Sequence, residues 1–321
     1  MSTHHTVIGA GPVGRAVAEQ LAGAGHAVRV LTRSGSGPDH PLVERRRADV
    51  AGPGLAEAVG DAHAVFLCLH ASAYDVRAWR RELPALEAAV LRVAADLGAP
   101  VVFPESLYSY VRTDRPMTED DPRDRATGKG AVRRDLLRAR AQSPATTVSV
   151  VASDFVGPHV RAGGHLGERV VPALLRGERR RLRVLGSLDQ PHSWTFVPDL
   201  ARAMVVAAAD PAAAGRVVHA PTAGPRTQRE MIHLLAETAG VGTPPLGVLP
   251  TPVLRAVGLA HRQTRELVEI SYQFERPFVL SSTASEARLG LRPTTPEEAA
   301  RQTVAWWRDE LGLDESSAAV A

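Results

Sequence analysis

Three glycines close to the N-terminus have the spacing of a dinucleotide-binding turn. Gly9, Gly11 and Gly14 follow a short apolar run, which predicts a strand, and open a segment with helical spacing. In that context the first glycine allows a tight turn, the second lets the backbone approach a pyrophosphate, and the third lets helix and strand pack closely. The helix N-terminus adds N–H groups and a positive dipole end. We therefore predict that this turn, with Pro12 and Val13, binds the phosphates of a dinucleotide.

The end of the next predicted strand bears on the choice of cofactor. An NAD site normally places Asp or Glu there, to accept a hydrogen bond from the ribose 2′-hydroxyl. This chain has Thr32, Arg33 and Ser34. An arginine and two hydroxyls suit a 2′-phosphate, which no carboxylate would repel. The sequence favours NADP over NAD, and Asp49 with Val50, after the third strand, is expected near the adenine.

Lys129 is the only lysine among 38 lysines and arginines. A coding bias toward arginine could leave one lysine by chance. The alternative is that the chemistry at this position needs a compact, flexible point charge and not a planar guanidinium.

The elements that must position these residues alternate along the first half of the chain. Val-rich runs without polar alternation separate helical segments, which predicts an α/β doubly wound (Rossmann) parallel sheet covered on both faces. Residues 1–156 are expected to form the NADP-binding domain, with parts of 182–222 completing the sheet. A smaller mixed α/β substrate-binding lobe is expected from 157–181 and 223–315, followed by a tail at 316–321.

Two local signals refine this picture. Pro84 is expected to kink or restart the long helix predicted over 74–99, because proline lacks the N–H that a helix interior uses. Thr227, with Glu230 three residues later, has the pattern of a capping box and predicts a helix start.

The composition excludes several classes of partner. Hydrophobic residues are 44%, charged residues 23% and the net charge is +3, so neither nucleic acid nor membrane is an expected partner. The single cysteine, Cys68, cannot form an internal disulfide and is expected to pack in a strand. Histidine spacings typical of metal sites are absent from the sequence, so no metal is expected. The first predicted strand begins within a few residues of the start of the sequence, which favours a cytoplasmic location. A homodimer is one oligomeric state that the sequence leaves open.

With the glycine turn, three further segments carry a resemblance. They are "FPESLYSY", the lone lysine and "SWTFVPDLARAM". The chain resembles a short-chain dehydrogenase/reductase, and more narrowly the extended or atypical members of the NAD-dependent epimerase/dehydratase family, over nearly all of residues 5–310. This resemblance is specific for the fold and the cofactor class, and much less so for the substrate.

The resemblance implies catalytic roles. Ser106 would hold the substrate oxygen, and Lys129 would bind the nicotinamide ribose and lower the pKa of a tyrosine four residues earlier on the same helix face. That tyrosine would pass a proton as hydride moves. Here the position is Arg125. A guanidinium is a poor proton donor, although it could bind a carboxylate or polarise a carbonyl of the substrate.

Three explanations of the missing tyrosine stay open. In the first, the phenol of another tyrosine supplies the proton. Tyr108 is the leading candidate. Tyr110 is the second, and its alternative role is packing. In the second, water or the substrate supplies the proton. In the third, the fold performs isomerisation, elimination or cyclisation, with the cofactor structural or absent.

The resemblance also suggests which residues line the remaining cleft. Leu69 and His70, after the fourth strand, are expected to contact the cofactor. Asp154 and Phe155, after the sixth strand, are expected beside the nicotinamide. Candidate residues for the substrate pocket, each with a structural alternative, are Arg125, His192, Trp194 and Tyr272.

We expect an NADP-dependent oxidoreductase that reduces a carbonyl or conjugated small molecule. A specialised biosynthetic pathway is one context in which such a reaction would occur. His192 and Ser193 stand where relatives acting on nucleotide sugars often carry a phosphate-binding arginine, which argues against such a substrate. The alternatives are a non-redox isomerase, lyase or cyclase, a nucleotide-sugar epimerase or dehydratase, and a protein that senses NADP(H).

Overall fold

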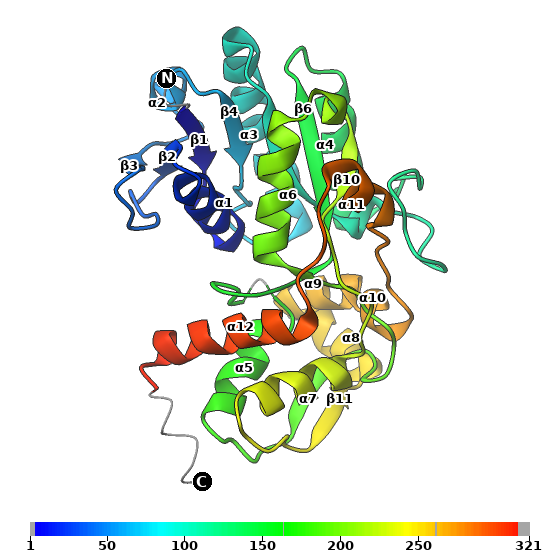
Figure 1. Ribbon diagram of the computed structural model, residues 1–321. Helices are drawn as coiled ribbons and strands as arrows, with labels where there is room; N and C mark the ends of the chain where they lie inside the picture. The colour runs from blue at the N-terminus through cyan, green and yellow to red at the C-terminus, as the bar shows by residue number, and fades with distance from the viewer. Residues whose placement is uncertain (1–3, 163, 261, 314–321) are drawn as a thin grey trace.

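A computed structural model describes residues 4–162, 164–260 and 262–313 of the chain. Figure 1 shows two parts, a large sheet with its helices and a smaller lobe beneath it. The predicted tail at 316–321 lies outside the described residues. No helix in the described part of the chain is both long and apolar enough to span a membrane.

The large part contains a seven-stranded sheet in which all neighbouring strands run parallel. In spatial order the strands are β10 (Val217–His219), β6 (Thr147–Ala152), β5 (Val101–Ser106), β4 (Ala64–Leu67), β1 (His4–Ile8), β2 (Ala27–Thr32) and β3 (Val43–Arg47). This order confirms the predicted doubly wound fold. The chain extends the sheet from β1 to β3 on one side and then returns to β4 on the other, so the crevice for a ligand lies at the carboxyl ends beside β1.

Helices cover both faces of the sheet. On one face lie α1 (Pro12–Gly23) and α6 (Val197–Ala209), and on the other lie α2 (Leu55–Val59), α3 (Val76–Leu97) and α4 (Gly128–Ala141). Successive residues of β1 serve opposite faces: Val7 packs with α1 and Ile8 packs with α2 and α3. Burial on both sides explains why the inner strands β4 and β6 are buried along their whole length, whereas the edge strand β3 carries charged residues.

The smaller lobe has its own apolar core and lies below the carboxyl ends of the strands (Figure 1). Its elements are α5 (Gly167–Leu175), β8 (Leu182–Leu185), α7 (Gln228–Thr238), β11 (Leu246–Leu249), α8 (Thr251–Ala260), α9 (Arg262–Ile270), α10 (Tyr272–Glu275) and α12 (Pro296–Leu311). Between the two parts, β7 (Asp154–Val156) pairs in parallel with β9 (Trp194–Phe196). The remaining short elements are α11 (Thr283–Leu289) and the 3-10 turns Leu107–Ser109 and Pro211–Ala213.

Two local predictions can be compared with these elements. A single helix, α3, runs through Pro84, so the helix does not restart there. The capping box at the start of α7 is confirmed, because the Thr227 side chain accepts from the Glu230 N–H and the Glu230 carboxylate accepts from the Thr227 N–H.

Candidate active site

The glycine turn has the shape that a dinucleotide phosphate requires. Gly9 has a φ of +104°, and a Cβ there would lie 2.9 Å from the carbonyl oxygen of Cys68. A Cβ on Gly14 would lie 2.0 Å from the carbonyl oxygen of Gly9, whereas one on Gly11 would meet nothing within 4 Å. Gly11 caps α1 and Pro12 opens it. The turn is therefore closed toward the protein and open where a pyrophosphate would approach the helix N-terminus.

Cations and hydroxyls gather where β2 ends. The Thr32 hydroxyl donates to the carbonyl oxygen of Ser36 at 3.0 Å, and the Ser34 and Ser36 hydroxyls lie 2.8 Å apart. Arg33 is exposed, and Arg47 lies opposite Thr32 in the β2–β3 register. Within the described ranges, neither arginine has a carboxylate at ion-pair distance. Sequence reasoning missed Arg47, whose signal was its place at the end of the run "VERRR".

The other residues expected to contact the cofactor differ in their burial and in their contacts. The Asp49 carboxylate accepts from the Ala51 N–H at 3.0 Å, and Val50 is buried in the core beneath the sheet. Leu69 packs at the edge of the same core. His70 is exposed beside Tyr74, with ring centroids 6.3 Å apart.

Two phenols meet next to the end of β5. The hydroxyls of Tyr74 and Tyr108 lie 2.6 Å apart, and the Lys129 ammonium lies 4.7 Å from the centroid of the Tyr74 ring. Burial, followed by the charges of Tyr74 and Asp154, raises the pKa of Tyr108 well above its usual range. Both phenols are therefore neutral near pH 7 and can donate protons. Sequence reasoning missed Tyr74, which lies 34 residues before Tyr108 and has no local motif.

Lys129 is buried and ion-paired. Its ammonium donates to the carboxylates of Glu266 and Glu269, the latter at 3.0 Å, and its backbone N–H donates to Glu269 at 2.7 Å. Two negative charges thus surround one positive charge, and they lie at the N-terminus of α4, where the helix dipole favours anions. These glutamates, from α9 in the other lobe, were not anticipated.

Ser106 is held by its neighbour in the chain. The Glu105 carboxylate accepts from the Ser106 N–H at 2.7 Å and from its hydroxyl at 3.3 Å. Glu105 is itself buried and bonded to Arg140 at 2.9 Å, and Arg140 also binds Glu87 through two hydrogen bonds. This buried network joins α3, α4 and β5, and so fixes the position of Ser106 at the cleft.

Arg125 does not share a helix with Lys129. The expectation of a common helix face was wrong because α4 begins at Gly128, whose φ is +61°, with Thr127 as its cap. Arg125 instead lies in the preceding loop and donates twice to the carbonyl oxygen of Tyr110, while its guanidinium lies 4.7 Å from the centroid of the Tyr272 ring. The structure thus brings together two of the residues expected in the substrate pocket.

Tyr110 is fully buried. Its hydroxyl lies 2.7 Å from Nε2 of His219 on β10, and its ring packs in an apolar cluster with Met117 and Phe278. These surroundings favour the packing alternative for Tyr110 over a part in proton transfer.

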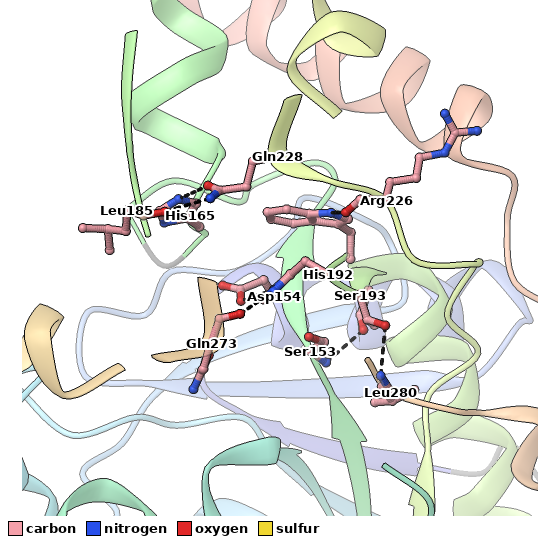
Figure 2. A network of polar contacts seen from close by, with 12 residues as sticks. Ser153, Asp154, His165, Leu185, His192, Ser193, Arg226, Gln228, Gln273 and Leu280 are labelled. Atoms are coloured by element: carbon pink, nitrogen blue, oxygen red, sulfur yellow. Dashed lines mark hydrogen bonds and ion pairs between the residues drawn. The ribbon is translucent and has the colours of Figure 1, made fainter. Parts of the chain in front are cut away.

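A second polar network, shown in Figure 2, joins β7, β9 and the smaller lobe. Nε2 of His192 lies 2.8 Å from the Asp154 carboxylate, and Nδ1 lies 3.1 Å from the carbonyl oxygen of Gln273. The Trp194 indole stacks obliquely on His192 and donates to the carbonyl oxygen of Arg226. The ring nitrogens of His192 and Trp194 are therefore already hydrogen-bonded within the protein, and His192 supports Asp154.

The neighbouring residues of this network are similarly engaged. The Ser193 hydroxyl accepts from the N–H of Leu280, and the Ser153 N–H donates to the Thr195 hydroxyl. Phe155 packs partly buried against the core formed with α1 and α6. These contacts set the position of Asp154 at the carboxyl end of β6.

The parallel sheet with its switch point and the glycine turn at the start of α1 define a dinucleotide-binding Rossmann fold. The model of the NAD dependent epimerase/dehydratase family matches residues 6–219, and the chain belongs to that family. The membership confirms the resemblance and the expectation of an enzyme of the oxidoreductase/epimerase type. No curated protein sequence matches the chain.

Solved structures show the same fold at low identity. The enzyme WbmH of Bordetella bronchiseptica, solved with NAD+, is 18% identical with a TM-score of 0.74, over 96% of this chain and 99% of that one. The UDP-glucose 4-epimerase of Thermotoga maritima, solved with UDP-glucose, is 18% identical with a TM-score of 0.73, over 96% and 100%. An epimerase of Methanothermobacter thermautotrophicus is 18% identical with a TM-score of 0.74, over 98% and 95%.

Proposed function

We propose that the protein is an NADP-dependent reductase of the short-chain type, acting on a carbonyl or conjugated small molecule. The observation that carries the proposal is the Tyr74–Tyr108 hydroxyl pair, 2.6 Å apart, on the loops after β4 and β5. It offers a candidate proton donor two residues after Ser106 in the chain, and so supports a replacement for the tyrosine that the family pattern has and this chain lacks. A reductase needs such a donor for the oxygen that gains negative charge.

The residues of the turn and of the β2 end would hold the cofactor. Gly11 and the N-terminus of α1 would receive the pyrophosphate, and Arg33 and Arg47 would bind a 2′-phosphate together with the hydroxyls of Thr32 and Ser34. The printed family name and the bound NAD+ of WbmH support NAD as the alternative. The free arginines and the lack of a carboxylate at this strand end favour NADP.

Ser106 and the two phenols would each have a separate role at the substrate oxygen. The Ser106 hydroxyl would orient that oxygen, and Tyr108 would donate its proton to it. Tyr74 would replace the proton on Tyr108 through their mutual hydrogen bond. A bound nicotinamide supplies the hydride in this chemistry.

Lys129 would contribute less to binding the ribose and to lowering a phenol pKa than the resemblance implies. Reaching a ribose hydroxyl would require its ammonium to give up part of its contact with Glu266 and Glu269. Because these carboxylates offset its charge, Lys129 would lower a phenol pKa little. A phenol of high pKa is a weak acid, but it stays protonated near pH 7. It is therefore in the form that donates a proton during reduction, and not in the phenolate form that accepts one during oxidation.

Epimerisation of a nucleotide sugar is the second candidate, and family membership favours it. The positions that would need to bind the diphosphate weigh against it. His192 and Ser193 are buried and their side chains are bonded within the protein. Arg176 and Arg179 to Arg181 are the remaining cations that could compensate.

The proposal can be tested by adding NADPH and a panel of small aldehydes, ketones and enones to the purified protein. We expect substrate-dependent loss of absorbance in the reduced nicotinamide band. Turnover of a substrate that continues after the cofactor has been stripped would overturn the proposal in favour of a redox-silent enzyme. Binding of NADPH without turnover of any substrate would support a sensor.

A further inference from the structure

Asp154, which is partly exposed, and the buried His192 form a pair that the proposed chemistry at the substrate oxygen does not use. Asp154 is the first residue of β7 and lies two residues after Ala152, which pairs with Ser106 where β5 and β6 end. Its Oδ2 lies 2.8 Å from Nε2 of His192, as Figure 2 shows.

The second ring nitrogen determines how many protons the pair holds. Nδ1 of His192 lies 3.1 Å from the backbone carbonyl oxygen of Gln273, which can only accept. Nδ1 therefore carries a proton. The contact at Nε2 then needs one further proton, which lies either on the ring or on the Asp154 carboxylate. In both forms one proton lies between Nε2 of His192 and Oδ2 of Asp154.

The surroundings of the ring direct that proton toward the cleft. The ring of His192 stacks on Phe274 and Phe278, with centroids 4.7 and 5.6 Å away, and only 1% of its side chain is exposed. The Asp154 side chain is 20% exposed. A proton therefore leaves or enters the pair through Asp154 and not through the ring.

Asp154 also lies within electrostatic reach of the phenols. Its negative charge contributes, after burial, to the raised pKa of Tyr108. The loops after β4, β5 and β6 therefore carry two separate candidate proton donors, the Tyr74–Tyr108 pair and the Asp154–His192 pair. Reduction of a simple carbonyl needs one proton, at the oxygen. Reduction of a conjugated carbonyl also needs a proton at a carbon.

We propose that Asp154 is a second acid–base residue, positioned by His192, and that the substrate is an α,β-unsaturated carbonyl compound; this inference rests on the proposed reductase function. One hydride from a reduced nicotinamide would add to the β-carbon, and the alkene electron pair would move to form an enolate. Ser106 and Tyr108 would hold its oxygen. Asp154 would give a proton to the α-carbon, which restores the C=O bond. The alkene is reduced, the nicotinamide is oxidised, and the pair regains its proton from water.

The test compares 2-cyclohexen-1-one and cinnamaldehyde with their saturated counterparts, using NADPH in D2O. The wild-type protein should reduce the alkene and place one deuterium on the α-carbon. Asp154→Asn should lower the rate on the enones about 100-fold, as expected for loss of a general acid, and should lower the ratio of enone turnover to saturated-carbonyl turnover at least tenfold. His192→Gln should lower the enone rate about tenfold.

His165→Gln is a matched control, because His165 stacks on the same Phe274 ring but bonds to Gln228 and not to Asp154. It should leave the deuterium incorporation and the enone rate unchanged. Equal enone rates in wild type and Asp154→Asn would overturn the inference while leaving the reductase function intact. So would activity confined to saturated carbonyls. No NADPH oxidation with any probe would contradict the proposed function itself, and with it the inference.

A second measurement needs no substrate and no cofactor. The imidazole N–H proton bonded to Gln273 is shielded from water, so proton NMR should show a slowly exchanging downfield signal. The signal should be lost in His192→Gln, shift in Asp154→Asn and persist in His165→Gln. A signal unaffected by Asp154→Asn would show that Asp154 does not share a proton with His192.

Discussion

The hydroxyls of Tyr74 and Tyr108 lie 2.6 Å apart, although 34 residues separate them in the chain. Tyr74 is 41% exposed, so the pair is accessible to solvent. It joins the loop after β4 to the loop after β5, and the Lys129 ammonium lies 4.7 Å from the centroid of the Tyr74 ring.

Replacing either phenol should slow proton delivery. We expect Tyr108→Phe to lower kcat at least 100-fold, in the range of general acid catalysis, and Tyr74→Phe to lower it about tenfold. Steady-state kinetics with NADPH would measure both. Tyr110→Phe is the control: it loses the bond to His219, which should cost about 1 kcal/mol of stability but leave kcat within threefold. A larger fall in kcat for Tyr110→Phe than for Tyr108→Phe would contradict these assignments.

The choice of cofactor should depend on Arg33 and Arg47. Removing either guanidinium should weaken NADPH binding about tenfold or more, because each would lose charge-assisted bonds to the 2′-phosphate. Binding of NADH should change little. Titration of each variant with both cofactors measures the difference. Arg45→Ala, on the same strand but ion-paired with Asp39, should affect neither cofactor. Equal weakening of NADPH and NADH by Arg33→Ala would refute the assignment.

The carboxylates around Lys129 should set the pH range of the reaction. In Glu269→Gln the ammonium has one fewer negative neighbour, so its charge should stabilise a phenolate and lower the phenol pKa. Since the neutral phenol is the proton donor, the alkaline limb of kcat/KM should move to lower pH. A pH–rate profile tests this, with Glu297→Gln, on the surface beside Arg226, as control. A shift to higher pH would be inconsistent with the account.

Disrupting the buried network of Glu87, Glu105 and Arg140 should lower the free energy of unfolding substantially. Arg140→Met would leave the buried carboxylate of Glu87 without its partner and that of Glu105 with Arg133 alone, and should lower the free energy of unfolding by about 3–5 kcal/mol. Arg138→Ala, on the same helix, removes an exposed pair with Asp124 and should cost less than about 1 kcal/mol. Denaturant unfolding of the two variants compares them directly, and similar losses would show that burial does not govern the network.

Stability should fall in mild acid. Burial lowers the pKa of His5 and of His165 from 6.5 to about 4. Between pH 6.5 and 4 the unfolded chain therefore binds protons that the folded chain excludes, so stability is full above pH 6.5 and decreases as the pH falls through this window. Each residue contributes roughly 3 kcal/mol at most. Thermal unfolding from pH 8 to 4 should show a weaker dependence in His5→Gln; an unchanged slope would be evidence against this origin.

Local patterns were sufficient for much of the fold and for the cofactor turn. The spacing of Gly9, Gly11 and Gly14, the Val-rich strands and the Thr227–Glu230 capping box each depend on residues close in sequence, whose geometry follows from backbone sterics and periodicity. The start of α4 was misjudged because Gly128, at positive φ, places Arg125 before the helix.

The contacts that determine the chemistry lie beyond such reasoning. Glu269 reaches Lys129 across 140 residues, and His192 reaches Asp154 across 38. No spacing rule predicts these pairs, because they depend on how α9 and β9 pack against the end of the sheet. The sequence identified the individual residues Lys129, Asp154 and His192 as candidates, but not the partners that change what each can do.

Hydride transfer from NADPH to the substrate can be followed with an isotope label on the cofactor. NADPH carrying deuterium at C4 of the nicotinamide should be incubated with the protein and the panel of small carbonyl compounds, and the products analysed by mass spectrometry. We predict one deuterium on a carbon of the reduced product, stereospecifically from one face of the nicotinamide. A product formed without deuterium from either C4 position would contradict the account and identify the enzyme as redox-silent.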